Sequence, residues 1–189
     1  MVEEQKHDVV YEDETTKAKV ELAKVETKTG EETEECIFKM RCKLFRFRDN
    51  QWKERGIGNC KLLRNKAEKK IRFVMRQEKT LKPVGNFLLS ESPLCDLATM
   101  KNSADKAWFW SCNDCSEEEA AIEKLAVRFQ NVENSTLFKD AFNAAKEFNI
   151  KAKAGDEDLV WAEAIEDVEE VLEDDIDTNK TADADGEEN

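Results

Sequence analysis

The sequence predicts a mainly β fold, in which a bent antiparallel sheet of about seven short strands is closed by one C-terminal α-helix. From Cys36 onward, apolar residues alternate with polar ones at a period of two, as in half-buried strands. After Phe129 the apolar residues recur at helical spacing instead. Both ends of the chain are acidic and poor in apolar clusters. We therefore expect one domain at 36–150 between acidic, flexible arms at 1–35 and 151–189.

The first predicted strand covers residues 36–47 and follows the acidic block at 31–35. The residues between its apolar positions are mostly basic, so one face of the strand should be apolar and the other positively charged. The apolar positions change phase by one residue between Leu44 and Phe45. A change of phase within one strand predicts a β-bulge or a sharp bend.

The remaining elements follow in chain order. Asp49-Asn50 predicts a turn before a second strand at 51–63, in which Gly56 and Gly58 permit another backbone to approach closely. Further strand-like runs lie at 69–76, 84–89, 94–100, 107–112 and 125–129. Asn131 is a suitable N-cap for the helix, whose apolar residues recur at helical spacing: Leu137, Phe138, Ala141, Phe142, Ala145 and Phe148.

Charge is distributed unevenly along the 189 residues, whose formal net charge is -13. Residues 1–35 hold 5 basic and 12 acidic side chains, residues 36–150 hold 22 and 15, and residues 151–189 hold 3 and 16. From Lys39 to Lys82 there are 16 basic and only 4 acidic side chains. A basic domain between acidic arms predicts a surface that binds an acidic partner, and the competing interpretation is that the arms only keep the domain soluble. The acidic total argues against nucleic acid and anionic membranes as partners.

The sequence lacks the usual motifs of catalysis and metal binding. Its only histidine, His7, lies in the N-terminal arm, where a general base would have no rigid surroundings. A phosphate-binding loop is absent, and the Cys112/Cys115 pair has no second pair of zinc ligands. A secretory signal and a membrane-spanning run are also absent. We therefore expect a non-enzymatic protein of the cytoplasm or nucleus, without metal or cofactor.

Several motifs, in order along the domain, resemble those of the Ran-binding domain family. They are FKMRCKLFRF at 38–47, WKERGIG at 52–58, KLL at 61–63, RFVMR at 72–76, KTLK at 79–82, KAWFW at 106–110 and LAVRF at 125–129. A weaker similarity extends upstream over 26–32. The resemblance implies the pleckstrin-homology type of fold, a bent seven-stranded sheet closed by a C-terminal helix. This agrees with the elements expected from periodicity alone.

The resemblance also implies a function. Members of that family bind the small GTPase Ran in its GTP form, hold its acidic C-terminal segment, and wrap their N-terminal arm around it. They help to release transport receptors and assist the GTPase-activating protein without supplying a catalytic group. The partners implied are thus GTP-bound Ran and, in transient complexes, the GTPase-activating protein and transport receptors. The protein would be a monomer that is cytoplasmic and shuttles through the nucleus.

The resemblance further implies which residues contact Ran. These are Glu26 and Lys28 in the arm, and Trp52, Lys53, Arg55, Gly56, Arg72, Arg76, Lys79, Thr80, Lys82, Asn86, Trp108 and Trp110 in the domain. The basic members alternate with apolar residues and should share a face that holds an acidic segment. The alternatives are that Trp52 packs at a strand start, that the basic residues form an ordinary solvated face, and that the two tryptophans of KAWFW belong to a large core.

The C-terminal arm contains a second candidate signal. Apolar residues recur at helical spacing among acidic ones, as in a nuclear export signal: Trp161, Ile165, Val168, Val171 and Leu172. Two other functions compete with Ran binding. A phosphoinositide-binding surface would use the basic strands, but the acidic arms would be repelled by an anionic membrane. A histone-chaperone role would rest on the acidic tail alone.

Overall fold

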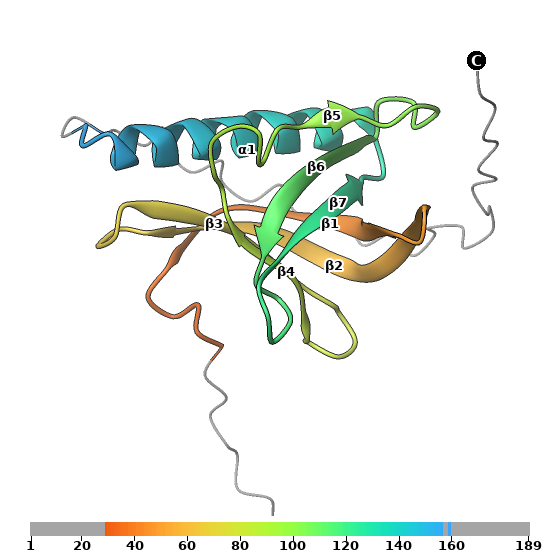
Figure 1. Ribbon diagram of the computed structural model, residues 1–189, viewed down its shortest axis with the longest axis horizontal. Helices are drawn as coiled ribbons and strands as arrows, with labels where there is room; N and C mark the ends of the chain where they lie inside the picture. The colour runs from red at the N-terminus through yellow and green to blue at the C-terminus, as the bar shows by residue number, and fades with distance from the viewer. Residues whose placement is uncertain (1–28, 157–158, 160–189) are drawn as a thin grey trace, which may run out of the picture.

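Seven antiparallel strands and one long helix account for most of the residues that the computed structural model describes, which are 29–156 and 159. In chain order the elements are β1 (Glu35–Arg48), β2 (Gln51–Asn65), β3 (Lys70–Arg76), β4 (Pro83–Leu88), β5 (Ala98–Thr99), β6 (Ala107–Asp114), β7 (Ala121–Arg128) and α1 (Val132–Lys153). The strands form one sheet in the order β4-β3-β2-β1-β7-β6-β5. The sheet bends strongly, and α1 lies across its open side (Figure 1). The predicted sheet and closing helix are confirmed.

Strand β1 pairs with β2 along its whole length and with β7 only over Lys43–Arg46. The register with β2 shifts between Leu44 and Phe45. The bulge predicted from the change of apolar phase is therefore confirmed. As a result Leu44 is fully buried in the core, whereas Phe45 is only half-buried.

Among the predicted strands, the run at 94–100 differs most from the structure. Only Ala98–Thr99 pair as β5, and the preceding residues form turns. The backbone N–H of Cys95 donates to the carbonyl of Ser111 at 2.7 Å, which attaches this loop to β6. Leu94 and Leu97 pack against the core from the loop. Their apolar character therefore reflects burial and not membership of a strand.

Helix α1 begins as predicted, with the side chain of Asn131 accepting a hydrogen bond from the backbone N–H of Asn134 at 2.7 Å. Its apolar face closes a core that contains eight aromatic residues. The rings of Trp110 and Phe142 have centroids 5.2 Å apart, and Phe73 stacks on Phe87 at 4.8 Å. The helix therefore fixes the sheet through its aromatic residues.

All six cysteines are free thiols, and burial raises the pKa of Cys60, Cys95 and Cys112, which leaves these three thiols protonated at neutral pH. Within residues 29–156, the structure contains no helix with the length and apolar character needed to cross a bilayer.

Candidate functional site

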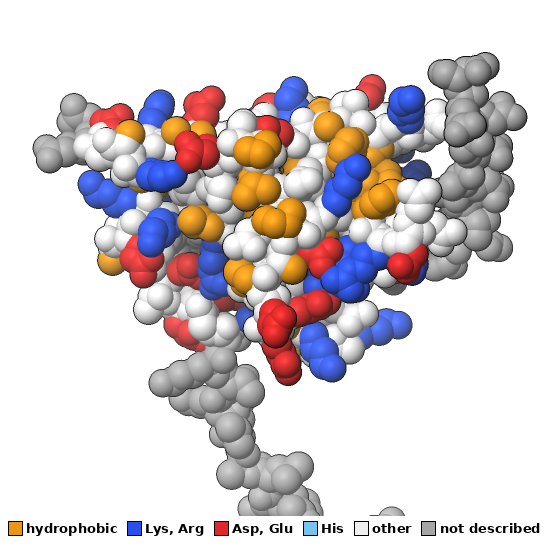
Figure 2. Space-filling view, viewed as in Figure 1, with side chains coloured by type: hydrophobic (Ala, Val, Ile, Leu, Met, Phe, Trp, Pro, Cys, Tyr) orange, Lys and Arg blue, Asp and Glu red, His pale blue; other side chains and the backbone are white. Residues whose placement is uncertain are grey.

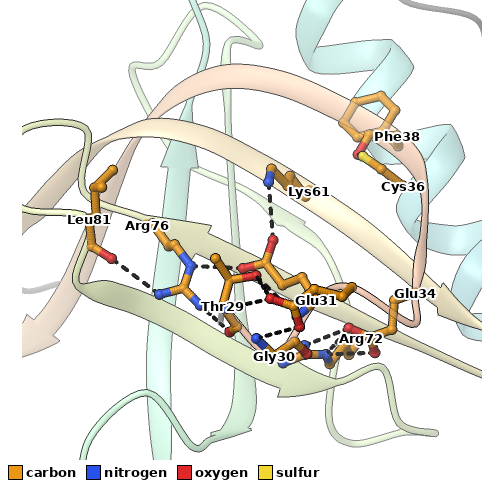
Figure 3. Close-up of polar contacts among 11 residues, drawn as sticks. Thr29, Gly30, Glu31, Glu34, Cys36, Phe38, Lys61, Arg72, Arg76 and Leu81 are labelled. Atoms are coloured by element: carbon orange, nitrogen blue, oxygen red, sulfur yellow. Dashed lines mark hydrogen bonds and ion pairs between the residues drawn. The ribbon is translucent and has the colours of Figure 1, made fainter. Parts of the chain in front are cut away.

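The N-terminal strap, defined as residues 29–34, lies over strands β2 and β3 and is held by their basic side chains (Figure 3). Arg72 donates from Nε to the carboxylate of Glu34 at 2.9 Å and from Nη2 to the carbonyl of Gly30 at 3.2 Å. Arg76 donates from Nε to Glu31 at 2.7 Å and from Nη2 to the carbonyl of Thr29 at 2.9 Å. Arg72 and Arg76, which were predicted to contact a partner, are thus occupied by the protein's own acidic segment.

The strap has a local conformation that presents its acids to the sheet. Gly30 has φ +78°, in the left-handed region that glycine adopts without strain. The carboxylate of Glu32 accepts hydrogen bonds from the Thr29 hydroxyl and the Gly30 N–H at 3.0 Å each. A turn follows, closed by the Glu34 N–H donating to the Glu31 carbonyl at 3.0 Å. This turn places Glu31 and Glu34 on the same side, facing Arg76 and Arg72.

The charges of the strap and the sheet stabilise each other. Burial alone would raise the pKa of Glu31, but hydrogen bonds from Arg76 and Lys61 outweigh burial and lower that pKa below its ordinary value. The hydrogen bond to Glu34 raises the pKa of Arg72. Next to the strap, the start of β1 adds a further pair, Glu35 with Arg64. The strap is therefore an ion-paired part of the folded domain.

A second cluster of charges joins β2 to the end of β6. The Arg55 guanidinium, with only 9% of the side chain exposed, lies 2.9 Å from the carboxylate of Asp114, whose side chain is 2% exposed. Arg55 also donates to Ser116 and Glu117 at 2.9 Å each. Asp114 in turn accepts from the backbone N–H of Asn86 at 2.8 Å. Arg55 was predicted to touch the partner, but its guanidinium is already occupied within the domain.

An aromatic cluster, defined as Phe47, Trp52 and Phe109, forms between the β1–β2 hairpin and β6. The Trp52 ring lies edge-on to Phe47, with centroids 5.1 Å apart, and 6.0 Å from Phe109. The ammonium of Lys124 lies 4.9 Å from the centroid of Phe109 and 5.1 Å from that of Phe47. All three rings are only partly buried. The cluster is therefore an apolar surface with one cation available for protein contact.

The two tryptophans of the KAWFW motif have different surroundings. Trp110 is 1% exposed and packs among core aromatics, so the core alternative describes it and direct contact with a partner does not. Trp108 is partly buried, and its indole N–H donates to the Ser135 carbonyl at 3.0 Å. The Lys139 ammonium lies 5.7 Å from the Trp108 ring. Trp108 thus joins β6 to the first turn of α1.

The β3–β4 loop carries two exposed basic residues. Within the described ranges, Lys79 and Lys82 are exposed and make no ion pair. Between them Leu81 is 67% exposed. The loop is closed by the Gln77 N–H donating to the Lys82 carbonyl at 2.9 Å. This loop can therefore offer two cations and one apolar side chain to a partner.

The other predicted site residues have local roles. Lys53 pairs with Asp49 across the hairpin turn, the hydroxyl of Thr80 donates to Gln77 at 2.6 Å, and Gly56 is buried. Asn86 accepts from Arg72 Nη1 at 2.8 Å. Glu26, Lys28 and the candidate export signal from Trp161 to Leu172 lie outside the described residues.

Basic and acidic side chains are interspersed on the face seen in Figure 2, with apolar side chains between them. Sequence reasoning missed the strap acids Glu31 and Glu34 as site residues. Their signal was the acidic block directly before β1, which was interpreted as the end of an unattached arm.

Comparison with known proteins identifies the fold and the family. Residues 26–148 match the family model described as RanBP1 domain, a range that includes the strap, the whole sheet and most of α1. The chain belongs to the RanBP1 domain family. The Ran-specific GTPase-activating protein homolog of Dictyostelium discoideum is 46% identical over 132 residues, which are 66% of this chain and 66% of that protein. The family predicted from the motifs is therefore confirmed.

Two further similarities show how much of a relative the match covers and which fold the chain shares with a solved structure. The E3 SUMO-protein ligase RanBP2 of Homo sapiens is 41% identical over 121 residues, which are 63% of this chain but 4% of that protein. The match to each of these relatives thus spans less than two thirds of its length. The crystal structure of the Ran binding domain of Nup2 from Ashbya gossypii superposes with a TM-score of 0.50 at 22% identity, covering 61% of this chain and 97% of that one. It shares the pleckstrin-homology-like fold of the RanBP1 domain.

Proposed function

We propose that this RanBP1 domain binds the small GTPase Ran in its GTP form and acts as a non-catalytic adaptor in nucleocytoplasmic transport. In this role it would assist the GTPase-activating protein and help to release transport receptors, while supplying no catalytic group. The observation that carries the proposal is the family match, which extends from the strap through the whole sheet to most of α1. The relative from Dictyostelium discoideum, named as Ran-specific, supports the same partner.

The surfaces of the domain are suited to such a partner. The aromatic cluster can bury apolar area, and the β3–β4 loop offers Lys79 and Lys82 to acidic groups. Selectivity for one nucleotide state requires that the two states of the partner differ in what they present to these surfaces. An acidic segment that is exposed in only one state would provide that difference.

The proposal is tested by loading Ran with GTP or GDP and measuring its affinity for the full chain. We expect the GTP form to bind at least about tenfold more tightly, which corresponds to about 1.4 kcal/mol. Vesicles containing phosphoinositides are included as a second ligand, and they are expected to show no binding above neutral vesicles. Equal affinity for the two Ran forms would contradict the proposal.

The β3–β4 loop gives a separate prediction. The Lys79→Glu/Lys82→Glu variant should bind GTP-loaded Ran about tenfold more weakly at low salt, mainly through slower association, because two exposed charges no longer attract the partner. The dependence of affinity on salt should also become flatter. The control variant Lys101→Glu/Arg128→Glu changes net charge equally on exposed residues away from the loop. If both variants lose affinity equally, general charge and not this loop is responsible.

A further inference from the structure

The guanidinium groups of Arg72 and Arg76 have little capacity left for an external carboxylate. Arg72 donates to Glu34 from Nε, to Asn86 from Nη1 and to Gly30 from Nη2. Arg76 donates to Glu31 and Thr29, and from Nη1 to the Leu81 carbonyl at 3.2 Å. An arginine offers five N–H donors in a fixed geometry, so these contacts occupy most of each group. A partner would have to displace the strap before it could pair with either arginine.

The strap's carboxylates are also well enclosed. The Glu34 side chain is 9% exposed and that of Glu31 is 12% exposed. Glu31 has a second cation, Lys61, at 3.1 Å. Charges in such positions cost several kcal/mol to leave unpaired, whereas exposed ion pairs are worth less than about 1 kcal/mol. The arrangement is thus expected to persist and not to open spontaneously.

An apolar surface lies under the same region. Alternation along β3 places Val74 between Arg72 and Arg76 on the side away from the core, yet Val74 is 2% exposed. On β2, Leu63 also faces away from the core and is 2% exposed, and neither residue belongs to the main core cluster. The strap lies over this side of the sheet (Figure 3). The side of the sheet that faces the strap therefore carries buried apolar side chains as well as the arginines.

From these contacts we infer that Arg72 and Arg76 are positioning residues, which anchor the strap to the sheet and so fix the position of Thr29, where the rest of the N-terminal arm joins the domain. This inference rests on the proposed function, because the arm's origin matters only when Ran is bound. It is an alternative to the prediction that these arginines hold the partner's acidic segment themselves. The partner's acidic groups are left to cations such as Lys79 and Lys82.

The first test uses the unbound full chain and does not depend on Ran. Amide hydrogen exchange should become faster at residues 30–35 in the Arg72→Glu/Arg76→Glu variant, while amides in α1 keep their protection. Arg128→Glu, a charge reversal at an exposed arginine on β7, should leave exchange in the strap unchanged. Unchanged exchange at 30–35 in the double variant would overturn the anchoring.

The second test asks whether anchoring matters for binding. Arg72→Glu and Glu34→Arg should each weaken the affinity for GTP-loaded Ran about tenfold, and the two together should recover most of that loss, because the ion pair is restored with its charges exchanged. If Arg72 contacts Ran directly, the combined variant will bind as weakly as Arg72→Glu, and the inference is wrong. Failure of the unchanged protein to bind Ran would instead contradict the proposed function, and the exchange result would still stand.

Discussion

The Arg55→Ala variant is expected to lose about 3–5 kcal/mol of its free energy of unfolding, because the change leaves a buried carboxylate without its cation. Asp114, at 2% side-chain exposure, would keep only the hydroxyl of Ser116 and the N–H of Asn86 as donors. Small domains are stable by only about 5–15 kcal/mol, so much of the molecule's stability depends on this one contact.

Urea unfolding at neutral pH, followed by tryptophan fluorescence and by circular dichroism, measures the loss. A matched control is Lys70→Ala, which removes an ion pair to Glu68 whose members are 56% and 59% exposed, and which should cost less than about 1 kcal/mol. The Arg55→Ala/Asp114→Asn variant should recover part of the stability, since it removes the buried charge as well. If Arg55→Ala were as mild as the control, the buried ion pair would not have the structural role assigned to it.

This result also determines how binding data on the WKERGIG motif should be interpreted. A fall in affinity for Ran in Arg55→Ala would reflect a changed fold, unless it is measured under conditions where the variant is fully folded. Lys53, two residues before Arg55 on β2, is exposed and forms its ion pair with Asp49 across the hairpin turn. Lys53→Ala can therefore report on contact with the partner without the stability effect.

Features that depend on neighbouring residues could be predicted from the sequence. The phase change at Leu44 and Phe45 produces the β1 bulge, and Asn131 caps α1, because each signal acts within a few residues. The alternation of basic and apolar residues on β3 correctly placed Arg72 and Arg76 on the outer side of the sheet. Local pattern thus determines which face a side chain occupies.

The partners of those side chains could not be predicted in the same way. Arg72 and Glu34 are 38 positions apart in the chain, and Arg55 and Asp114 are 59 apart. Such pairs depend on how strands and loops meet in space, and a charged residue on a face can meet solvent, a partner or its own chain. Trp108 and Trp110 show the same limit, since they share a phase but only Trp110 is in the core.

A second large loss of unfolding free energy is expected on substitution of Gly58, which lies against the backbone of Arg76. A Cβ added to Gly58 would lie 2.3 Å from the carbonyl oxygen of Arg76, far closer than such atoms can approach. The obstacle is the main chain of Arg76, which cannot move aside as a side chain can. The neighbouring backbone is also held in place, because the Glu78 N–H donates a hydrogen bond to the Ile57 carbonyl at 2.9 Å. Gly58→Ala should therefore cost about 3 kcal/mol, near the upper end for overpacking.

A matched control lies two residues away on the same strand, where a Cβ on Gly56 would meet Val84 at an ordinary 3.4 Å. Gly56→Ala is expected to change the unfolding free energy by less than about 1 kcal/mol, and equal losses at the two positions would contradict the steric argument. Any shift of the Arg76 backbone in Gly58→Ala also moves a group that anchors the strap. Hydrogen exchange at residues 30–35 should then increase in Gly58→Ala and not in Gly56→Ala, which connects packing at the β2–β3 junction directly to the origin of the N-terminal arm.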